Sequence, residues 1–119
     1  MARFGMNLKL TIEESHRPRV RALFVDILGA RAVAPTPRLE AYKTEDGGSV
    51  GVFYVPATEA LSTEDQRKGA WLEFRVDDPD AVASRIVASG VAPVAYEDKS
   101  HHYFQVPGGP VFRLAPNER

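Results

Sequence analysis

The chain has 119 residues, with 15 lysines and arginines against 16 aspartates and glutamates, a net charge of −1 and no cysteine. This length fits one compact domain or two fused half-domains, and the charge balance predicts neither a nucleic-acid partner nor binding to an anionic membrane. The missing cysteines exclude a disulfide framework, a thiolate metal site and a cysteine nucleophile. No apolar leader opens the chain and no apolar run approaches the roughly 18 residues of a membrane span, so we expect a cytoplasmic protein.

The first patterned stretch predicts a strand followed by a helix. Apolar and polar residues alternate over 7–13, which is typical of a strand with one apolar face. A helix is predicted next, with Ser15 as a candidate cap, an apolar stripe over 20–28 and a stop at Gly29. Two prolines in 30–37 restrict that segment to an edge strand or an irregular stretch.

The remainder of this half predicts a hairpin and a polar connection. Strands are expected over 39–44 and 50–55, joined by a turn at 45–48 that contains a glycine pair. The stretch 56–69 is polar and lacks strand alternation, which predicts a linker with one helical turn near 58–61.

The second half opens on a clearer pattern of the same kind. In the strand 71–76, one face is apolar and the other carries an indole and two charges, Trp71, Glu73 and Arg75. Asp78 is placed to cap the next helix, with Pro79 at its first position and Gly90 at its end. Three further strands are expected, and they are 93–96, 101–106 and 110–114.

The two halves repeat each other. Gly29 recurs at Gly90 and Gly47 recurs at Gly108, an offset of 61 residues in both cases. We therefore predict an α+β fold of two β-α-β-β-β modules. The predicted boundaries are 1–57 for the first module, 58–69 for the linker and 70–119 for the second module, all within one compact domain.

Three motifs in this order resemble the vicinal oxygen chelate superfamily, which includes glyoxalase, bleomycin-resistance and dioxygenase-like proteins. They are FVDILGA at 24–30, WLEFRVDDPD at 71–80 and FQVPGGPVFRL at 104–114. The resemblance implies that the sheets of the two modules are mixed and curved, and that they form a cup whose concave face binds substrate. It also implies a homodimer, because members of this superfamily commonly pair or exchange half-units.

The resemblance further implies four positions at which enzymatic members hold a divalent cation. Carried over to this sequence, these are Lys9, Val52, Trp71 and Arg113. A lysine and an arginine repel a divalent ion, and a valine and a tryptophan offer no suitable lone pair. We therefore expect no metal and no cofactor, and we favour a binding protein over an enzyme.

Strand alternation assigns a set of residues to the concave face as candidate ligand contacts. These candidates are Lys9, Thr11, Val52, Tyr54, Trp71, Glu73 and Arg113, accompanied by Val50 and Val111. The indole can stack on a flat or cationic group, and the lysine and arginine can pair with a carboxylate. The expected function is metal-free binding or sequestration of a flat or anionic small organic ligand. In the competing interpretation, Glu73 neutralises Lys9 or Arg113 inside a filled cup and Trp71 packs in the core.

Two other functions compete with this one. An enzyme of the same superfamily, such as a lyase, isomerase or dioxygenase, would need non-standard metal or acid-base residues, for which Glu40, Glu73, His101 and His102 are the candidates. A non-catalytic module would instead use its surfaces for assembly. Because His101 and His102 are adjacent, they point to opposite faces of a strand, and the sequence leaves open which of them faces the cup. The identity of the ligand, and whether a cup forms within one chain or between two, also stay open.

Overall fold

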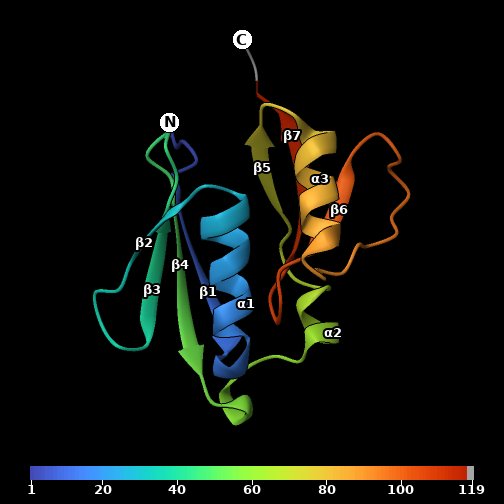
Figure 1. Cartoon of the computed structure of the whole chain (residues 1–119). Coiled ribbons are helices and arrows are strands. Elements are labelled where there is room, and N and C mark those ends of the chain that lie inside the picture. The colour runs from blue at the N-terminus through green and yellow to red at the C-terminus, as the bar shows by residue number, and fades with distance from the viewer. Residues whose placement is uncertain (118–119) are drawn as a thin grey trace. The chain divides into compact units, whose positions relative to one another are not determined.

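The computed structural model describes residues 1–117, which form two compact units, one over Met1–Ala60 and one that begins at Leu61 (Figure 1). Each unit contains one mixed β-sheet with a helix on one face. The predicted α+β fold with a repeated β-α-β arrangement is confirmed. Within the described residues, no helix has both the length and the apolar character needed to cross a bilayer.

The first unit has a four-stranded sheet in the order β1-β4-β3-β2. Strands β1 and β4 are parallel, and the other neighbouring pairs are antiparallel. Its elements are β1 (Asn7–Glu13), α1 (Arg17–Arg21), β2 (Arg31–Val33), β3 (Leu39–Lys43), β4 (Ser49–Val55) and short 3-10 turns at Glu14–His16 and Ala57–Glu59. Segment 30–37 begins with the short edge strand β2, and its two prolines, Pro35 and Pro37, lie in the irregular stretch that follows the strand.

The helix of the first unit differs from the predicted one at its start. Ser15 does not cap it: the Glu13 side chain accepts a hydrogen bond from the Ser15 backbone N–H at 3.0 Å and caps a 3-10 turn. After α1 the helix continues as a π-helical segment over Ala22–Ile27. It ends at Gly29, whose φ of +76° is the left-handed stop that the sequence predicts.

The second unit has a three-stranded sheet in the order β5-β7-β6, with β5 parallel to β7 and β6 antiparallel to it. Its elements are α2 (Thr63–Gln66), β5 (Leu72–Val76), α3 (Pro79–Ala88), β6 (His102–Gln105) and β7 (Val111–Pro116). The cap of α3 is the predicted one, because the Asp78 carboxylate accepts from the Ala81 backbone N–H at 3.2 Å. The helix covers the sheet face that carries Phe74, Phe104 and Phe112, whose rings are in contact.

The strand expected over 93–96 is reduced to a short pairing along the edge of β6. Pro93 forms an isolated bridge with Phe104, and the Val94 backbone N–H donates to the Tyr103 carbonyl at 2.9 Å. Pro93 supplies no N–H to a ladder, and the chain then leaves the sheet. The segment 95–101 is therefore a loop that returns to β6.

Candidate ligand-binding site

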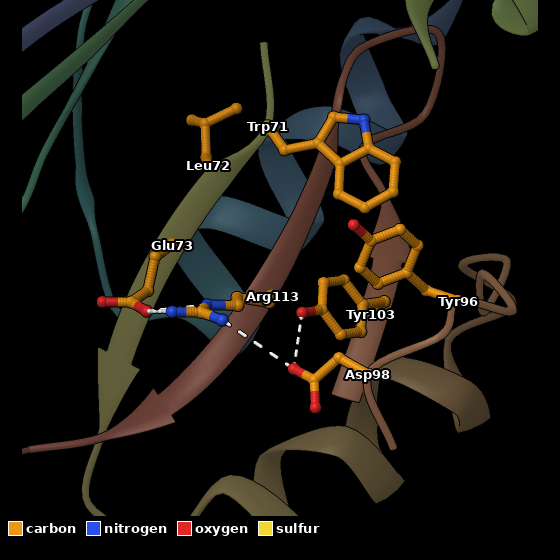
Figure 2. Close-up of a pocket in the computed structure, with 7 residues that line it drawn as sticks. All are labelled: Trp71, Leu72, Glu73, Tyr96, Asp98, Tyr103 and Arg113. Carbon is orange, nitrogen blue, oxygen red and sulfur yellow. Dashed lines mark hydrogen bonds and ion pairs between the residues drawn. The ribbon is translucent and has the colours of Figure 1, made fainter. Parts of the chain in front are cut away.

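A shallow pocket of about 570 Å³ lies in the second unit (Figure 2). Its lining residues are Trp71, Leu72, Glu73, Tyr96, Asp98, Tyr103 and Arg113. They come from β5 and the residue just before it, from β6 and β7, and from the loop 95–101. The pocket therefore combines a rigid sheet surface with one irregular segment.

Strand register explains why three of these side chains meet. Glu73 of β5 and Tyr103 of β6 both stand opposite Arg113 of β7. Neighbouring residues in register point to the same face of a sheet. This is the face opposite α3, because the residues that alternate with them carry the phenylalanine cluster beneath the helix.

Three aromatic rings form one wall of the pocket. The ring centroid of Trp71 lies 4.8 Å from that of Tyr96 and 5.8 Å from that of Tyr103, and the two tyrosine rings are 5.1 Å apart. These separations are typical of favourable edge-to-face pairs. Trp71 is 38% exposed and Tyr96 is 44% exposed, whereas Tyr103 is buried. The two exposed rings offer apolar surface to a ligand, and Tyr103 supports them.

The orientation of the indole is set by the chain that precedes β5. The Trp71 Nε1–H donates to the Arg67 carbonyl at 2.9 Å, and the Arg67 Nε–H donates to the Gln105 side-chain oxygen at 2.8 Å. The amide of buried Gln105 also donates to the carbonyls of Thr63 and Gly109. The α2 segment is thus tied to β6, and the ring of Trp71 is fixed against the pocket.

A group of charged side chains forms the opposite wall. Arg113 donates from Nε to Glu73 Oε1 at 2.8 Å, its Nη2 is also 2.8 Å from that oxygen, and its Nη1 lies 3.8 Å from Asp98. The second oxygen of Glu73 is 3.4 Å from Arg75 Nε. Part of the competing sequence interpretation is therefore correct, because Glu73 pairs with Arg113. The other part is wrong, because Trp71 is exposed.

Asp98 is the most heavily hydrogen-bonded side chain of the pocket. Its carboxylate accepts from the Ser100 backbone N–H at 2.8 Å, from the Ser100 hydroxyl and from the Tyr103 hydroxyl at 2.8 Å, and it lies 2.8 Å from His101 Nδ1. The Ser100, Tyr103 and His101 donors hold the pKa of Asp98 well below its usual range. Hydrogen bonds to Tyr103 and Glu73 raise the pKa of Arg113. Both groups are therefore charged at neutral pH.

The candidates from the first unit do not share one face. Lys9 and Thr11 of β1 are together, with Lys9 Nζ 2.8 Å from the Thr11 hydroxyl and 5.5 Å from the centre of the Phe53 ring. Val52 and Tyr54 are buried on the opposite face, beneath the helix. The prediction that all four residues line one concave surface is wrong for Val52 and Tyr54, and equally for Val50.

The error has a simple physical origin. The parallel register pairs Lys9 with Gly51 and Thr11 with Phe53, so Gly51 and Phe53 share the face of Lys9. Across β5 and β7 the register pairs Glu73 with Arg113. The repeat offset of 61 residues makes Val52 the counterpart of Arg113, but Val52 points to the helix side of its sheet. The alignment is therefore wrong by one residue on this strand, and a shift of one residue moves a side chain to the other face of a sheet.

Correcting the register does not create a metal site of the kind that the resemblance implies. The corrected first-unit positions are Gly51 and Phe53, and neither side chain can donate a lone pair to a divalent cation. Lys9, Trp71 and Arg113 are unsuitable for the reasons already given. Within residues 1–117 there is no group of three or more histidine, aspartate or glutamate side chains that could hold an ion. The residues present therefore do not fit the superfamily's metal.

The alternative acid-base candidates are dispersed. Glu40 is buried beneath the first-unit helix, near Arg17 and hydrogen-bonded to Tyr42. His102 lies on the α3 side of its sheet, with Nε2 2.7 Å from Asp80. His101 contacts Asp98 at the edge of the pocket. Of the two histidines, only His101 reaches a residue that lines the pocket.

Sequence reasoning missed four of the residues that line the pocket, Leu72, Tyr96, Asp98 and Tyr103. Tyr103 could have been found, because alternation within the predicted strand 101–106 separates it from His102. Tyr96 and Asp98 lie in a loop without periodicity. No local pattern indicates that this loop folds back over the sheet.

Comparison with solved structures identifies the fold. The genomically encoded fosfomycin resistance protein FosX from Listeria monocytogenes, solved with Mn(II) and sulfate, matches with a TM-score of 0.74 and 14% identity, covering 99% of this chain and 93% of that one. A glyoxalase/dioxygenase from Nostoc punctiforme matches with a TM-score of 0.70 and 18% identity over 98% and 92% of the two chains. A glyoxalase/bleomycin resistance protein from Albidiferax ferrireducens matches with a TM-score of 0.68 and 16% identity over 96% and 98%.

Comparisons of sequence alone find no matching family model and no matching curated protein. The identities to the solved structures are low, so the likeness concerns the fold. At that level the resemblance drawn from the three sequence motifs is confirmed. This chain has the fold of the vicinal oxygen chelate superfamily, shared with glyoxalase, bleomycin-resistance and fosfomycin-resistance proteins.

Proposed function

We propose that this chain binds a small, flat organic molecule in the pocket of the second unit, without a metal ion and without transforming it. The observation that carries the proposal is the pair of exposed rings, Trp71 and Tyr96, standing over a pocket of about 570 Å³ beside fixed polar groups. Apolar walls with a few oriented polar side chains are typical of small-molecule sites. The fold supports this, because solved structures of resistance proteins share it.

The charges of the pocket favour a flat ligand over an anionic one. An anion would have to displace the Glu73 carboxylate, which already lies 2.8 Å from two nitrogens of Arg113. Asp98 adds a second negative charge nearby. Of the expected ligand classes, flat or anionic, we therefore propose the flat one, held chiefly by stacking on Trp71.

The enzyme alternative finds less support in the same contacts. A general base needs a lone pair directed at the substrate. Both oxygens of Glu73 face arginines, and both oxygens of Asp98 accept hydrogen bonds from neighbouring side chains or backbone. These carboxylates are engaged in holding the pocket together, which suits binding better than proton transfer.

The test follows the indole N–H resonance of Trp71 in ¹H–¹⁵N spectra, since the chain has a single tryptophan. 2-Naphthamide, 2-naphthoate and the non-planar cyclohexanecarboxamide are titrated at millimolar concentration into protein stripped with a chelator. We expect 2-naphthamide to shift the resonance most and cyclohexanecarboxamide to leave it in place. Phe4→Leu, at an exposed position in the other unit, is the control variant and should behave as wild type.

Two results would overturn the proposal. One is that neither naphthalene probe shifts the indole resonance. The other is a stoichiometric divalent ion in protein purified without chelator, together with probe binding only in its presence. The homodimer that the resemblance implies is part of the proposal and is tested separately by light scattering, where a monomer mass at high concentration would contradict it.

A further inference from the structure

The loop 95–101 contributes two of the seven pocket residues, Tyr96 and Asp98, although it has no regular secondary structure. Its backbone leaves the sheet after the Pro93 bridge and rejoins it at β6. A loop of this kind takes a defined shape only where side chains hold it. The question is which side chain places Tyr96 beside Trp71.

Asp98 has the contacts that this role requires. Within the loop, its carboxylate accepts hydrogen bonds from the backbone N–H and the hydroxyl of Ser100, and it lies 2.8 Å from His101 Nδ1. Such local bonds from an aspartate to residues two and three positions ahead define a tight turn. This carboxylate therefore fixes the turn over 98–101, while the Lys99 ammonium donates to the Tyr96 carbonyl at 2.6 Å.

The same carboxylate also ties the loop to the sheet. It accepts from the Tyr103 hydroxyl of β6 at 2.8 Å and lies 3.8 Å from Arg113 of β7. In Figure 2, Asp98 points toward both side chains from the loop side of the pocket. Because Tyr96 precedes Asp98 by two residues, anchoring Asp98 also restricts where the Tyr96 ring can lie. Asp98 thus connects the aromatic wall to the charged wall.

We infer that Asp98 is the positioning residue of this pocket: its carboxylate anchors loop 95–101 to Tyr103 and thereby holds Tyr96 against Trp71. The consequence for ligand selection rests on the proposed function, because a fixed second ring turns a single stacking surface into a shaped aromatic wall. Asp98 itself is not required to touch the ligand. Removing the Asp98 carboxylate should therefore displace the Tyr96 ring, and weaker ligand binding should follow from that displacement.

The experiment compares Asp98→Asn with Glu97→Gln in ligand-free protein. Both variants remove one negative charge from the same loop, but only Asp98 makes the anchoring contacts, and Glu97 is exposed. The amide introduced by Asp98→Asn would present N–H groups where Tyr103 and Ser100 donate. We expect Asp98→Asn to shift the Trp71 indole resonance, because the ring current of Tyr96 moves, and Glu97→Gln to leave it unchanged.

The second readout is 2-naphthamide affinity. Loss of one aromatic contact of ordinary strength weakens binding about three- to tenfold, and we expect that change for Asp98→Asn but not for Glu97→Gln. Tyr103→Phe removes the hydroxyl that donates to Asp98 and also contacts Arg113, while the ring and the loop sequence are kept. It should therefore reproduce part of the indole shift. This variant also decides the matter if Asp98→Asn does not fold.

An indole resonance that is unchanged in Asp98→Asn or, where that variant is unfolded, in Tyr103→Phe would overturn the inference. Equal shifts in Glu97→Gln and Asp98→Asn would also overturn it, because charge alone would then explain the effect. Failure of wild-type protein to bind either naphthalene probe refutes the proposed function instead. The ligand-free comparison still decides whether Asp98 positions the wall.

Discussion

Two buried tyrosines in the first unit should make the stability of the protein fall steeply at alkaline pH. The hydroxyls of Tyr42 and Tyr54 lie 2.8 Å apart, and the Tyr42 hydroxyl donates to Glu40 at 2.6 Å. Both tyrosine side chains are almost fully buried. Burial, followed by the hydrogen bonds to Glu40 and Tyr54, raises the pKa of Tyr42 far above its usual range. Burial raises the pKa of Tyr54 to about 12, although its hydrogen bond to Tyr42 acts in the opposite direction.

The sign and size of the effect follow from proton linkage. Each tyrosine has a higher pKa folded than unfolded, so its contribution is fully present below about pH 10 and is lost as the pH rises above that value. For Tyr54, the shift from about 10 to about 12 corresponds at pH 11 to a loss of about 1.4 kcal/mol. Tyr42 loses a similar amount at pH 11, because its own folded pKa is higher still. Together the two tyrosines remove about 3 kcal/mol from the free energy of unfolding between pH 9 and pH 11.

The assay is urea unfolding of wild type and Tyr54→Phe across this pH range. At pH 8 the variant should be less stable by about 1 kcal/mol, the usual value of one lost hydrogen bond. At pH 11 that difference should vanish or reverse, since phenylalanine does not titrate. Measuring the difference between two proteins cancels the general effect of alkali on lysines and arginines. A stability difference that stays constant from pH 8 to pH 11 would refute the reasoning.

Two further predictions concern the second-unit helix α3. Asp78→Ala should lower the free energy of unfolding by about 1 kcal/mol through loss of the helix cap, while Asp78→Ser should retain most of it. Equal urea midpoints for the two variants would argue against capping by the side chain. Ile86→Ala removes a fully buried side chain and should cost about 2–4 kcal/mol. Its neighbour Val87, which is 57% exposed, should tolerate alanine within about 0.5 kcal/mol; similar losses at the two positions would contradict the packing of α3.

Much of the fold could be predicted because the signals are local. Three kinds of signal each depend on residues only a few positions apart in the chain. They are the α3 cap at Asp78, the glycine stops at Gly29 and Gly90, and the alternation in β5. The internal repeat then indicates that the strand-helix unit occurs twice in the chain. Capping chemistry and side-chain periodicity act over short distances, so a sequence displays them directly.

The face of each strand was harder to predict. On β5 and β7 alternation correctly places Trp71, Glu73 and Arg113 together, whereas Val52 and Tyr54 were assigned to the wrong face. A repeat offset carries an uncertainty of one residue at each hairpin, and one residue is enough to invert a strand. Only the pairing of β1 with β4 decides which side chains lie under the helix.

The pocket depended most on the tertiary structure. The sequence by itself determined that an indole, a glutamate and an arginine share one sheet face, and that none of the four expected metal positions carries an ordinary ligand for a divalent cation. That the indole is exposed came only from the structure. Tyr96 and Asp98 reach this face because the loop 95–101 folds back and Asp98 meets Tyr103 and Arg113 on other strands. Contacts of that kind join residues by their place in the sheet and not by their spacing in the chain, so they exist only once the fold has formed.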